Sequence, residues 1–286
     1  MKPQLLKVST GPSHSFSVRR DVAPHFNNKW HYHEEVELIY FIKGEGTQFI
    51  GDSIKRFRSG DVVLVGKKLP HYWRFDNEFF DKKTDKNVDV RVVHFCENFW
   101  GDTFLKLKEN SSIKAVLENA RRGIEVRGTV RKRVVDMLEK IHDAEGPDRI
   151  IILLEILLQI AGSEQCILSS QPFSNKIDNA YNERINAIYE YSLANFRTKI
   201  HLNEIAAVAN ISPNSFCRYF KSQMRKTYSQ FLIELKVEYA CKLLMENKVI
   251  IKQLCYECGF NNFASFHKYF KLITGKTPLK YQKDFI

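Results

Sequence analysis

The 286-residue chain lacks the marks of membrane-spanning and secreted proteins. Its longest apolar run, Ile150 to Leu158, is interrupted by Glu155 and is too short and too charged to cross a bilayer. Met1 to Gln4 open the chain without the apolar stretch of a secretory signal. Six cysteines in a chain of this length indicate reduced thiols rather than a disulfide framework. The sequence therefore predicts a cytoplasmic protein that does not enter a membrane.

Motifs of common enzyme chemistries are also missing. The sequence has no glycine-rich phosphate loop, no nucleophile elbow and no pair of catalytic carboxylates. Apolar residues make up 44% and charged residues 27%, which is the balance of a folded protein and excludes a disordered chain. We expect two domains at this length, and we predict neither catalytic residues nor an enzyme activity.

Positive charge is distributed unequally along the chain. The net charge is +11, and the residues from Tyr181 onward contribute +8 of that excess. A basic excess concentrated in one domain is typical of proteins that bind nucleic acid, although a basic surface can also serve solubility alone.

Hydrophobic patterning changes from strands to helices near residue 111. Short β-branched or aromatic runs, separated by glycines, lie at Val36 to Ile42, Thr47 to Ile50, Asp61 to Val65 and Val88 to Phe95. Apolar residues then recur at helical spacing, with Gly146-Pro147 between two such helices. We predict an α+β protein with a small β-barrel over residues 1–110, a helical dimerisation segment over 111–165, a linker over 166–179 and an all-α domain over 180–286.

An internal repeat lies within the all-α domain. Residues 214–228 and 264–278 align at an offset of 50, and seven of the fifteen positions are identical. In the first copy, an apolar helix face around Ile205 and Ala206 is followed by a turn, where Ser212 can cap and Pro213 can open the next helix. In the second copy, Gly259-Phe260 stands at the turn. Each copy therefore predicts a helix-turn-helix, and an apolar stripe from Phe231 to Leu244 predicts a longer helix joining them.

Residues 180–286 resemble the DNA-binding domain of AraC-type transcription regulators. The resemblance is carried by Gly259-Phe260, by Phe266, Phe270 and Lys271, and by the closing run from Gly275 to Tyr281. It implies sequence-specific binding to double-stranded promoter DNA, usually with activation of transcription through RNA polymerase. The chain departs from the family pattern by having lysine or glutamine where arginine is usual, at Lys236, Lys268 and Gln282, and Arg225 in place of a common glycine.

The helical period predicts which side chains face DNA. With the repeated phenylalanines inward, the outward residues are Asn214, Cys217, Arg218 and Lys221 in the first copy, and Phe263, Ala264, His267, Lys268 and Lys271 in the second. The fork of Arg218 suits a guanine edge, whereas Lys221 and Lys271 suit phosphates. For each of these residues, a role as a solvated surface side chain is the alternative.

The first domain resembles cupin barrels. His31, His33, Glu37 and Gly44 match the first cupin motif, and Gly60-Asp61 with Pro70-His71 matches the second. In metal-dependent cupins, the residues at the places of His31, His33, Glu37 and His71 bind one divalent ion, and such ligands suit Fe, Mn, Ni or Zn. Even spacing along one strand would point the first three into the barrel. Many AraC-type regulators instead use this interior for a small effector, without a metal or other cofactor.

We predict an effector pocket in the barrel, with aromatic side chains that would suit stacking against a sugar ring or another flat ligand. The residues of this pocket are Trp30, His31, His33, Glu37, His71 and Trp73. A satisfied polar core at the same residues is the alternative. The sequence as a whole predicts a homodimeric, effector-responsive transcription regulator. A metal-dependent cupin enzyme fused to a DNA-binding domain, and a regulator controlled by its abundance alone, remain alternatives. Cys255 and Cys258 are interpreted as packing residues, because the chain has no second such pair to complete a zinc site.

Overall fold

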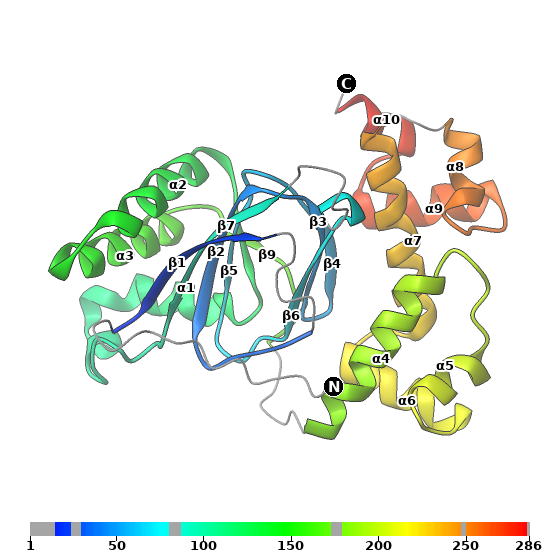
Figure 1. The fold of residues 1–286 in the computed structure, drawn as a ribbon, viewed down its shortest axis with the longest axis horizontal. Helices are drawn as coiled ribbons and strands as arrows, with labels where there is room; N and C mark the ends of the chain where they lie inside the picture. The colour runs from blue at the N-terminus through cyan, green and yellow to red at the C-terminus, as the bar shows by residue number, and fades with distance from the viewer. Residues whose placement is uncertain (1–14, 24–29, 80–86, 173–178, 247–249, 285–286) are drawn as a thin grey trace. The chain divides into compact units, whose positions relative to one another are not determined.

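The computed structural model of the chain describes residues 15–23, 30–79, 87–172, 179–246 and 250–284 (Figure 1). The chain divides near residue 177 into two compact units. The first unit contains the β-strands and three α-helices, and the second is helical. Met1 to Gln4 and residues 173–178 of the predicted linker lie outside the described residues. In the part of the chain that is described, no helix is both long and apolar enough to cross a membrane.

The first unit is built on two antiparallel sheets. The larger sheet has the order β1 (Ser17–Ala23), β7 (Val88–Phe95), β2 (Val36–Lys43), β5 (Val62–Val65), β8 (Ile124–Val126) and β9 (Cys166–Ile167). The smaller sheet has the order β4 (Ser53–Phe57), β3 (Gly46–Ile50) and β6 (His71–Phe75). The four strands predicted from the sequence correspond to β2, β3, β5 and β7.

The prediction of a closed barrel is wrong for the described residues. No described strand belongs to both sheets, because β2 pairs with β5 and β7 while β3 pairs with β6 and β4. The glycine turns fold the chain from one sheet to the other instead of continuing one sheet around a circle. The unit is an open arrangement of two sheets with a cupin-like strand pattern.

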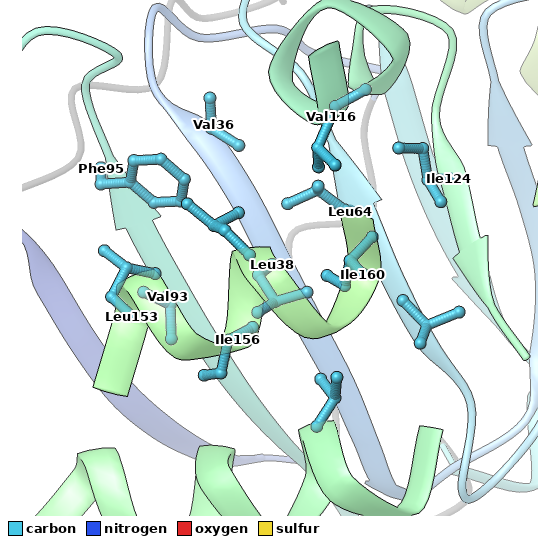
Figure 2. Close-up of a cluster of buried hydrophobic side chains, with 14 of the residues drawn as sticks. Val36, Leu38, Leu64, Val93, Phe95, Val116, Ile124, Leu153, Ile156 and Ile160 are labelled. Atoms are coloured by element: carbon cyan, nitrogen blue, oxygen red, sulfur yellow. The ribbon is translucent and has the colours of Figure 1, made fainter. Parts of the chain in front are cut away.

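Alternation along β2 gives the larger sheet two apolar faces. Leu38 points to a cluster that also contains side chains of helices, and Figure 2 shows it beside Val93, Ile156 and Ile160. Ile39 and Phe41 point to the other face, where they pack with Trp73 and Phe75 of the smaller sheet. Glu37 has the same parity as Ile39, so the strand directs its carboxylate into the space between the sheets.

Helices α1 (Ser111–Ala120), α2 (Gly128–Asp143) and α3 (Gly146–Ala161) provide the second layer on the larger sheet. Pro147 lies in the first turn of α3, as its fixed φ angle favours. Short 3₁₀ turns lie at Asn77–Phe79, Phe104–Lys106 and Lys108–Asn110. One side of α3 is buried, but Ile151 and Leu158 on its other side are about half exposed.

The last described segment of the first unit is clamped to the smaller sheet. The Asp52 carboxylate, in the β3–β4 turn, accepts hydrogen bonds from the Ser169 hydroxyl at 2.7 Å and the Ser170 amide at 2.9 Å. The Ser169 amide also donates to the Arg122 carbonyl at 2.7 Å. Residues 166–170 are therefore an integral part of this unit.

The second unit contains α4 (Asn179–Asn195), α5 (Leu202–Val208), α6 (Pro213–Met224), α7 (Tyr228–Met245), α8 (Ile251–Glu257), α9 (Phe263–Thr274) and α10 (Pro278–Lys283). The sequence repeat covers α6 and α9, and each of these helices is preceded by a short helix, α5 or α8, so the chain forms two helix pairs, α5–α6 and α8–α9. The long helix α7 lies between them in the chain and packs against α9 and α10.

The two copies end their second helix in the same way. Arg225 (φ 56°) and Gly275 (φ 74°) both adopt the left-handed conformation after α6 and α9. Thr227 and Thr277 then cap α7 and α10, accepting from the amides of Gln230 at 3.2 Å and Lys280 at 3.3 Å. The left-handed position explains why glycine is the common residue where this chain has Arg225.

A glycine in place of Arg225 should therefore make the second unit more stable than an alanine there. A residue with a Cβ in the left-handed region costs roughly 1 kcal/mol, which glycine avoids. We expect Arg225→Gly to raise the unfolding free energy by about that amount relative to Arg225→Ala, which keeps the Cβ and also lacks the guanidinium. Urea unfolding followed by circular dichroism measures the difference. Equal stabilities of the glycine and alanine variants would contradict the assignment of strain to this position.

Candidate nucleic-acid interface and histidine cluster

The first helix pair of the second unit presents one exposed face of α6. Phe216 and Phe220 are fully buried, and Ser212 precedes the helix at its amino end. All four residues that the sequence predicts to face DNA from this helix are exposed, namely Asn214, Cys217, Arg218 and Lys221. The face therefore offers an amide, a guanidinium and an ammonium group within two helical turns, which are donors and acceptors suited to base edges and phosphates.

The second pair repeats this arrangement on α9. Phe266 and Phe270 are buried, and the Asn262 side chain caps the helix by accepting from the Ser265 amide at 2.8 Å. Of the predicted contact residues here, His267 is partly buried and the others are exposed, namely Phe263, Ala264, Lys268 and Lys271. The structure brings each set onto one helix face, while their contact with DNA remains a prediction.

Close packing at the second turn depends on two sequence features. Gly259 has φ 78°, and a Cβ at this residue would lie 2.3 Å from the Arg197 carbonyl oxygen, so no other residue fits without rearrangement. Lys236 donates to the Gly259 carbonyl at 2.6 Å and lies over the Phe260 ring. Lys236, which departs from the family's usual arginine, is therefore occupied in holding this turn.

Cys255 and Cys258 lie in the core of the second pair. Both are fully buried beside Leu254 and Phe266. Burial raises the pKa of the Cys258 thiol to about 12, so the thiol stays protonated at neutral pH. Their positions support the interpretation as packing residues.

In the first unit, four predicted residues converge between the two sheets. One potential ligand atom from each of His31, His33, Glu37 and His71 lies within 4.8 Å of the others, and all four residues are buried. The residues reach this place differently from the prediction. A bend at Glu34 and Glu35 separates His33 from β2, and His31 forms an isolated bridge with His71, so a single strand does not direct the set.

Backbone carbonyls fix the orientation of two imidazoles. Nδ1 of His33 lies 2.8 Å from the Glu35 carbonyl oxygen, and Nδ1 of His71 lies 2.8 Å from that of Leu69. A carbonyl only accepts, so each Nδ1 must carry the proton and a neutral ring then has a lone pair on Nε2. These Nε2 atoms lie 3.2 Å and 3.5 Å from Oε2 of Glu37.

Lone pairs facing a carboxylate oxygen repel it unless the imidazoles gain a second proton or a cation lies between them. Nε2 of His71 is buried and has no hydrogen-bond partner in the described structure. A ligand histidine whose other nitrogen donates to a carbonyl is also the usual arrangement around bound metals. The residues therefore fit a divalent metal ion, which His31, His33, Glu37 and His71 would hold.

His94, which the sequence analysis missed, completes the surroundings of Glu37. It lies opposite Glu37 in the β2–β7 register, and its Nε2 donates to Oε2 of Glu37 at 2.8 Å. Nδ1 of His94 accepts from Arg19 at 3.1 Å, which fixes the tautomer. Alternation along the predicted strand would have placed His94 on the same face as the buried Val90 and Val92, and this was the signal available in the sequence.

Charge and burial act in opposite directions on this cluster. Burial alone would raise the pKa of the Glu37 carboxyl. In the protonation state where His33 and His71 carry their second proton, the charge of His71 and the hydrogen bonds from the imidazoles of His33, His71 and His94 hold that pKa well below its ordinary value. Burial lowers the pKa of His94, with Glu37 opposing the shift. Glu37 is therefore an anion at neutral pH, as a metal ligand must be.

The two predicted tryptophans are both buried. Trp30 and Trp73 are each only 2% exposed, and Trp73 donates from Nε1 to Oε1 of Glu37 at 3.2 Å. A groove of about 720 Å³ lies elsewhere in this unit, between the start of α2 and the end of α3, with Arg127, Arg133 and Leu158 in its lining.

Each of the two units contains a region that matches a known protein family. Residues 205–284 match the helix-turn-helix domain family, and residues 18–79 match the cupin domain family. The chain is 22% identical to an uncharacterized HTH-type transcriptional regulator, YdeC of Bacillus subtilis, over 88% of this chain and 85% of that protein. It is 21% identical to the transcriptional activator RhaR of Mannheimia succiniciproducens, over 94% and 91%.

Other matches cover different shares of the chain. The probable transcriptional regulator LumQ of Photobacterium leiognathi is 30% identical over 102 residues, which is 35% of this chain and 41% of LumQ. Among solved structures, the DNA-binding domain of AdpA in complex with a target DNA is 22% identical, covers 36% of this chain and 93% of its own, and has a TM-score of 0.34. ToxT of Vibrio cholerae is 13% identical over 94% of this chain and 97% of its own, with a TM-score of 0.36.

The described helices and these matches define a DNA-binding transcription regulator of the helix-turn-helix class. The cupin match near the amino terminus and the helix-turn-helix match near the carboxyl terminus agree with the resemblance to AraC-type regulators that the sequence shows.

Proposed function

We propose that the protein is a cytoplasmic, homodimeric regulator that binds promoter DNA through two helix-turn-helix units and responds to a ligand in its cupin domain. The observation that carries the DNA-binding part is the repeat itself. Two helix pairs, α5–α6 and α8–α9, share their buried phenylalanines and present exposed basic faces. We assign α6 and α9 as the helices that enter the major groove, by analogy with how this motif docks.

The predicted contact residues differ between the two units in what they can recognise. At an offset of 50, Asn214 and Arg218 of α6 correspond to Ala264 and Lys268 of α9. Amide and guanidinium groups make paired hydrogen bonds to adenine and guanine, whereas lysine mostly contacts phosphate. We propose that α6 supplies most of the base recognition and that α9 anchors the domain. Selection of bound sequences from random DNA by the purified protein, followed by footprinting, tests this function.

The histidine cluster is the proposed regulatory site. Its orphaned Nε2 and its buried anion favour a divalent cation over a purely structural polar core, which would need every group paired. A ligand changes the DNA-binding equilibrium only if it binds two states with different affinity. The proposal therefore requires that DNA affinity depend on the metal, and a regulator controlled by abundance alone would show no such dependence. Turnover by the metal-loaded protein would favour the cupin-enzyme alternative.

The proposed dimer interface is the exposed side of α3. Ile151 and Leu158 are seven residues apart, so they lie on one stripe of the helix, and an exposed apolar stripe of this kind is typical of an interaction surface. The buried apolar residues of the segment 111–165 pack within their own unit.

Introducing negative charge on this stripe of α3 should dissociate the proposed dimer. We expect the full-length variant Ile151→Asp/Leu158→Asp to sediment as a monomer at tens of micromolar, because a pair of carboxylates would have to be buried in each half of the interface. Asp136→Asn, which alters an exposed charge on α2 instead of α3, should leave the dimer intact. Analytical ultracentrifugation distinguishes them, and a double aspartate variant that still sediments as a dimer would place the interface elsewhere.

A further inference from the structure

His94 interrupts an apolar face of β7. Val90 and Val92 lie on the same face of this strand and are fully buried, and His94 itself is only 1% exposed. A valine would fill such a position without electrostatic cost, whereas a buried imidazole is costly unless its nitrogens have partners. Both nitrogens of His94 have one, in Arg19 and Glu37. Packing alone therefore does not account for a histidine at this position.

The two partners of His94 determine which of its nitrogens carries the proton. The Arg19 guanidinium can only donate, so Nδ1 of His94, 3.1 Å from Nη1 of Arg19, must accept. A neutral ring then carries its proton on Nε2, which donates to Oε2 of Glu37 at 2.8 Å. This tautomer is the opposite of that of His33 and His71, whose Nε2 atoms have lone pairs. His94 is thus a hydrogen-bond donor to the proposed ligand carboxylate and is excluded as a ligand itself.

The strand register of β1 brings Arg19 to His94. Arg19 lies opposite Val92 in the β1–β7 ladder, and Ser17, two residues earlier, lies opposite His94. Alternation therefore places the Arg19 side chain on the face of the larger sheet that meets the smaller sheet. Asp21, two residues later on the same face, accepts from Nε of Arg19 at 2.6 Å and orients the guanidinium. A chain of hydrogen bonds thus runs from the edge strand β1 to the carboxylate between the sheets.

Both oxygens of the Glu37 carboxylate accept a hydrogen bond. Oε1 accepts from Trp73 at 3.2 Å and Oε2 from His94 at 2.8 Å. Each oxygen keeps a second lone pair for a cation, and outer hydrogen bonds of this kind orient a ligating carboxylate. We propose that Arg19 and His94 are positioning residues of the proposed metal site: Arg19 holds His94 in the donating tautomer, and His94 holds Glu37 in the orientation that binds the ion. This inference rests on the proposed function of the histidine cluster.

Paired substitutions separate positioning from packing. His94→Leu removes the donor to Glu37, whereas His94→Gln retains an amide donor. Arg19→Met keeps an unbranched stem without a donor, whereas Arg19→Lys retains one. Arg20→Met is the matched control, because Arg20 follows Arg19 in the chain but lies on the opposite face of β1 and pairs with Asp89 at 2.9 Å. Calorimetric titration of the full-length protein with Zn²⁺ alone measures the metal affinity, and thermal unfolding without metal measures the stability of each variant.

We expect His94→Leu and Arg19→Met to weaken Zn²⁺ binding by roughly 10- to 100-fold, as the loss of an outer-shell partner does, and His94→Gln and Arg19→Lys to stay within about 3-fold of the wild type. Arg20→Met should bind as the wild type does. In the metal-free protein, nitrogen-15 NMR should show the His94 proton on Nε2, and Arg19→Met should lose this preference. A purely structural chain of hydrogen bonds would change the melting temperature and leave the metal affinity unchanged.

Wild-type Zn²⁺ affinity in Arg19→Met would overturn the inference, as would a proton on Nδ1 of His94 in the wild type. Tighter binding by Arg19→Met would also overturn it, because His94 would then have joined the ligands. The Arg19 side chain is 33% exposed, so this variant carries the test even where His94→Leu, in the core, does not fold. A wild type that binds neither Zn²⁺ nor Mn²⁺ would refute the proposed metal site together with the inference, whereas a wild type that binds Zn²⁺ no better than Arg19→Met refutes the inference alone.

Discussion

Arg218→Ala should lower affinity for the operator by about 1–3 kcal/mol, roughly 5- to 150-fold, and relax the preference at one base pair. The reason is that Arg218 is exposed on α6 beside Asn214 and carries the one guanidinium on that predicted face. Affinity for random DNA should change much less, because base recognition contributes little there. The ratio of operator to random-DNA affinity, measured at one fixed salt concentration, gives the result.

Lys221→Ala provides the matched comparison on the same helix. If Lys221 contacts a phosphate, its loss should weaken binding to all sequences and lower the slope of log affinity against log salt by about one. Arg218→Ala should thus lose sequence preference, whereas Lys221→Ala should lose affinity for every sequence. An unchanged affinity ratio for Arg218→Ala would show that this arginine does not read a base.

His33→Ala should abolish high-affinity binding of a divalent metal to the first unit. Loss of an outer-shell partner costs 10- to 100-fold in metal affinity, and loss of a direct ligand should cost more. For the wild type, Zn²⁺ or Mn²⁺ at roughly 100 times the dissociation constant should stabilise the unit by about 2.7 kcal/mol. Thermal unfolding with and without each metal, together with calorimetric titration, measures both effects.

His142→Ala is the control, because His142 is an exposed histidine of α2 in the same unit. It should retain the wild-type thermal shift. In the absence of metal, His33→Ala should bind DNA as the wild type does. A variant that is destabilised without metal and yet keeps the full metal-induced shift would identify the cluster as a structural core rather than a site.

The second unit could be predicted from the sequence in detail because its signals are local. Turn residues, caps and inward phenylalanines are short-range features, and the repeat displays each of them twice. The start of α6 follows from Pro213, whereas the cap of α9 at Asn262 was not identified from the sequence. The conformation of Arg225 could be inferred from its match to Gly275.

The first unit was harder to predict because its decisive features join distant parts of the chain. His94 contacts Glu37 from a strand far along the sequence, and Arg19 then sets the tautomer of His94. The bend after His33 is accompanied by a hydrogen bond from the His33 imidazole to the Glu35 carbonyl, and even spacing of histidines does not reveal this bend. The open edges between the two sheets depend on strand pairing, and hydrophobic alternation is the same for a barrel and for two facing sheets.

The hydrogen bonds that Asp52 accepts from Ser169 and Ser170 limit where a domain junction can be placed in this protein. Ser169 and Ser170 are hydrogen-bonded to the β3–β4 turn, and β9 is the edge strand of the larger sheet. A sensor domain that ends at residue 165 would therefore lose both this edge strand and these hydrogen bonds. A hybrid regulator that exchanges cupin domains should therefore place its junction after Ser170. Grafts joined upstream of Cys166 would expose the edge of β8, and an unprotected edge strand is a site of aggregation.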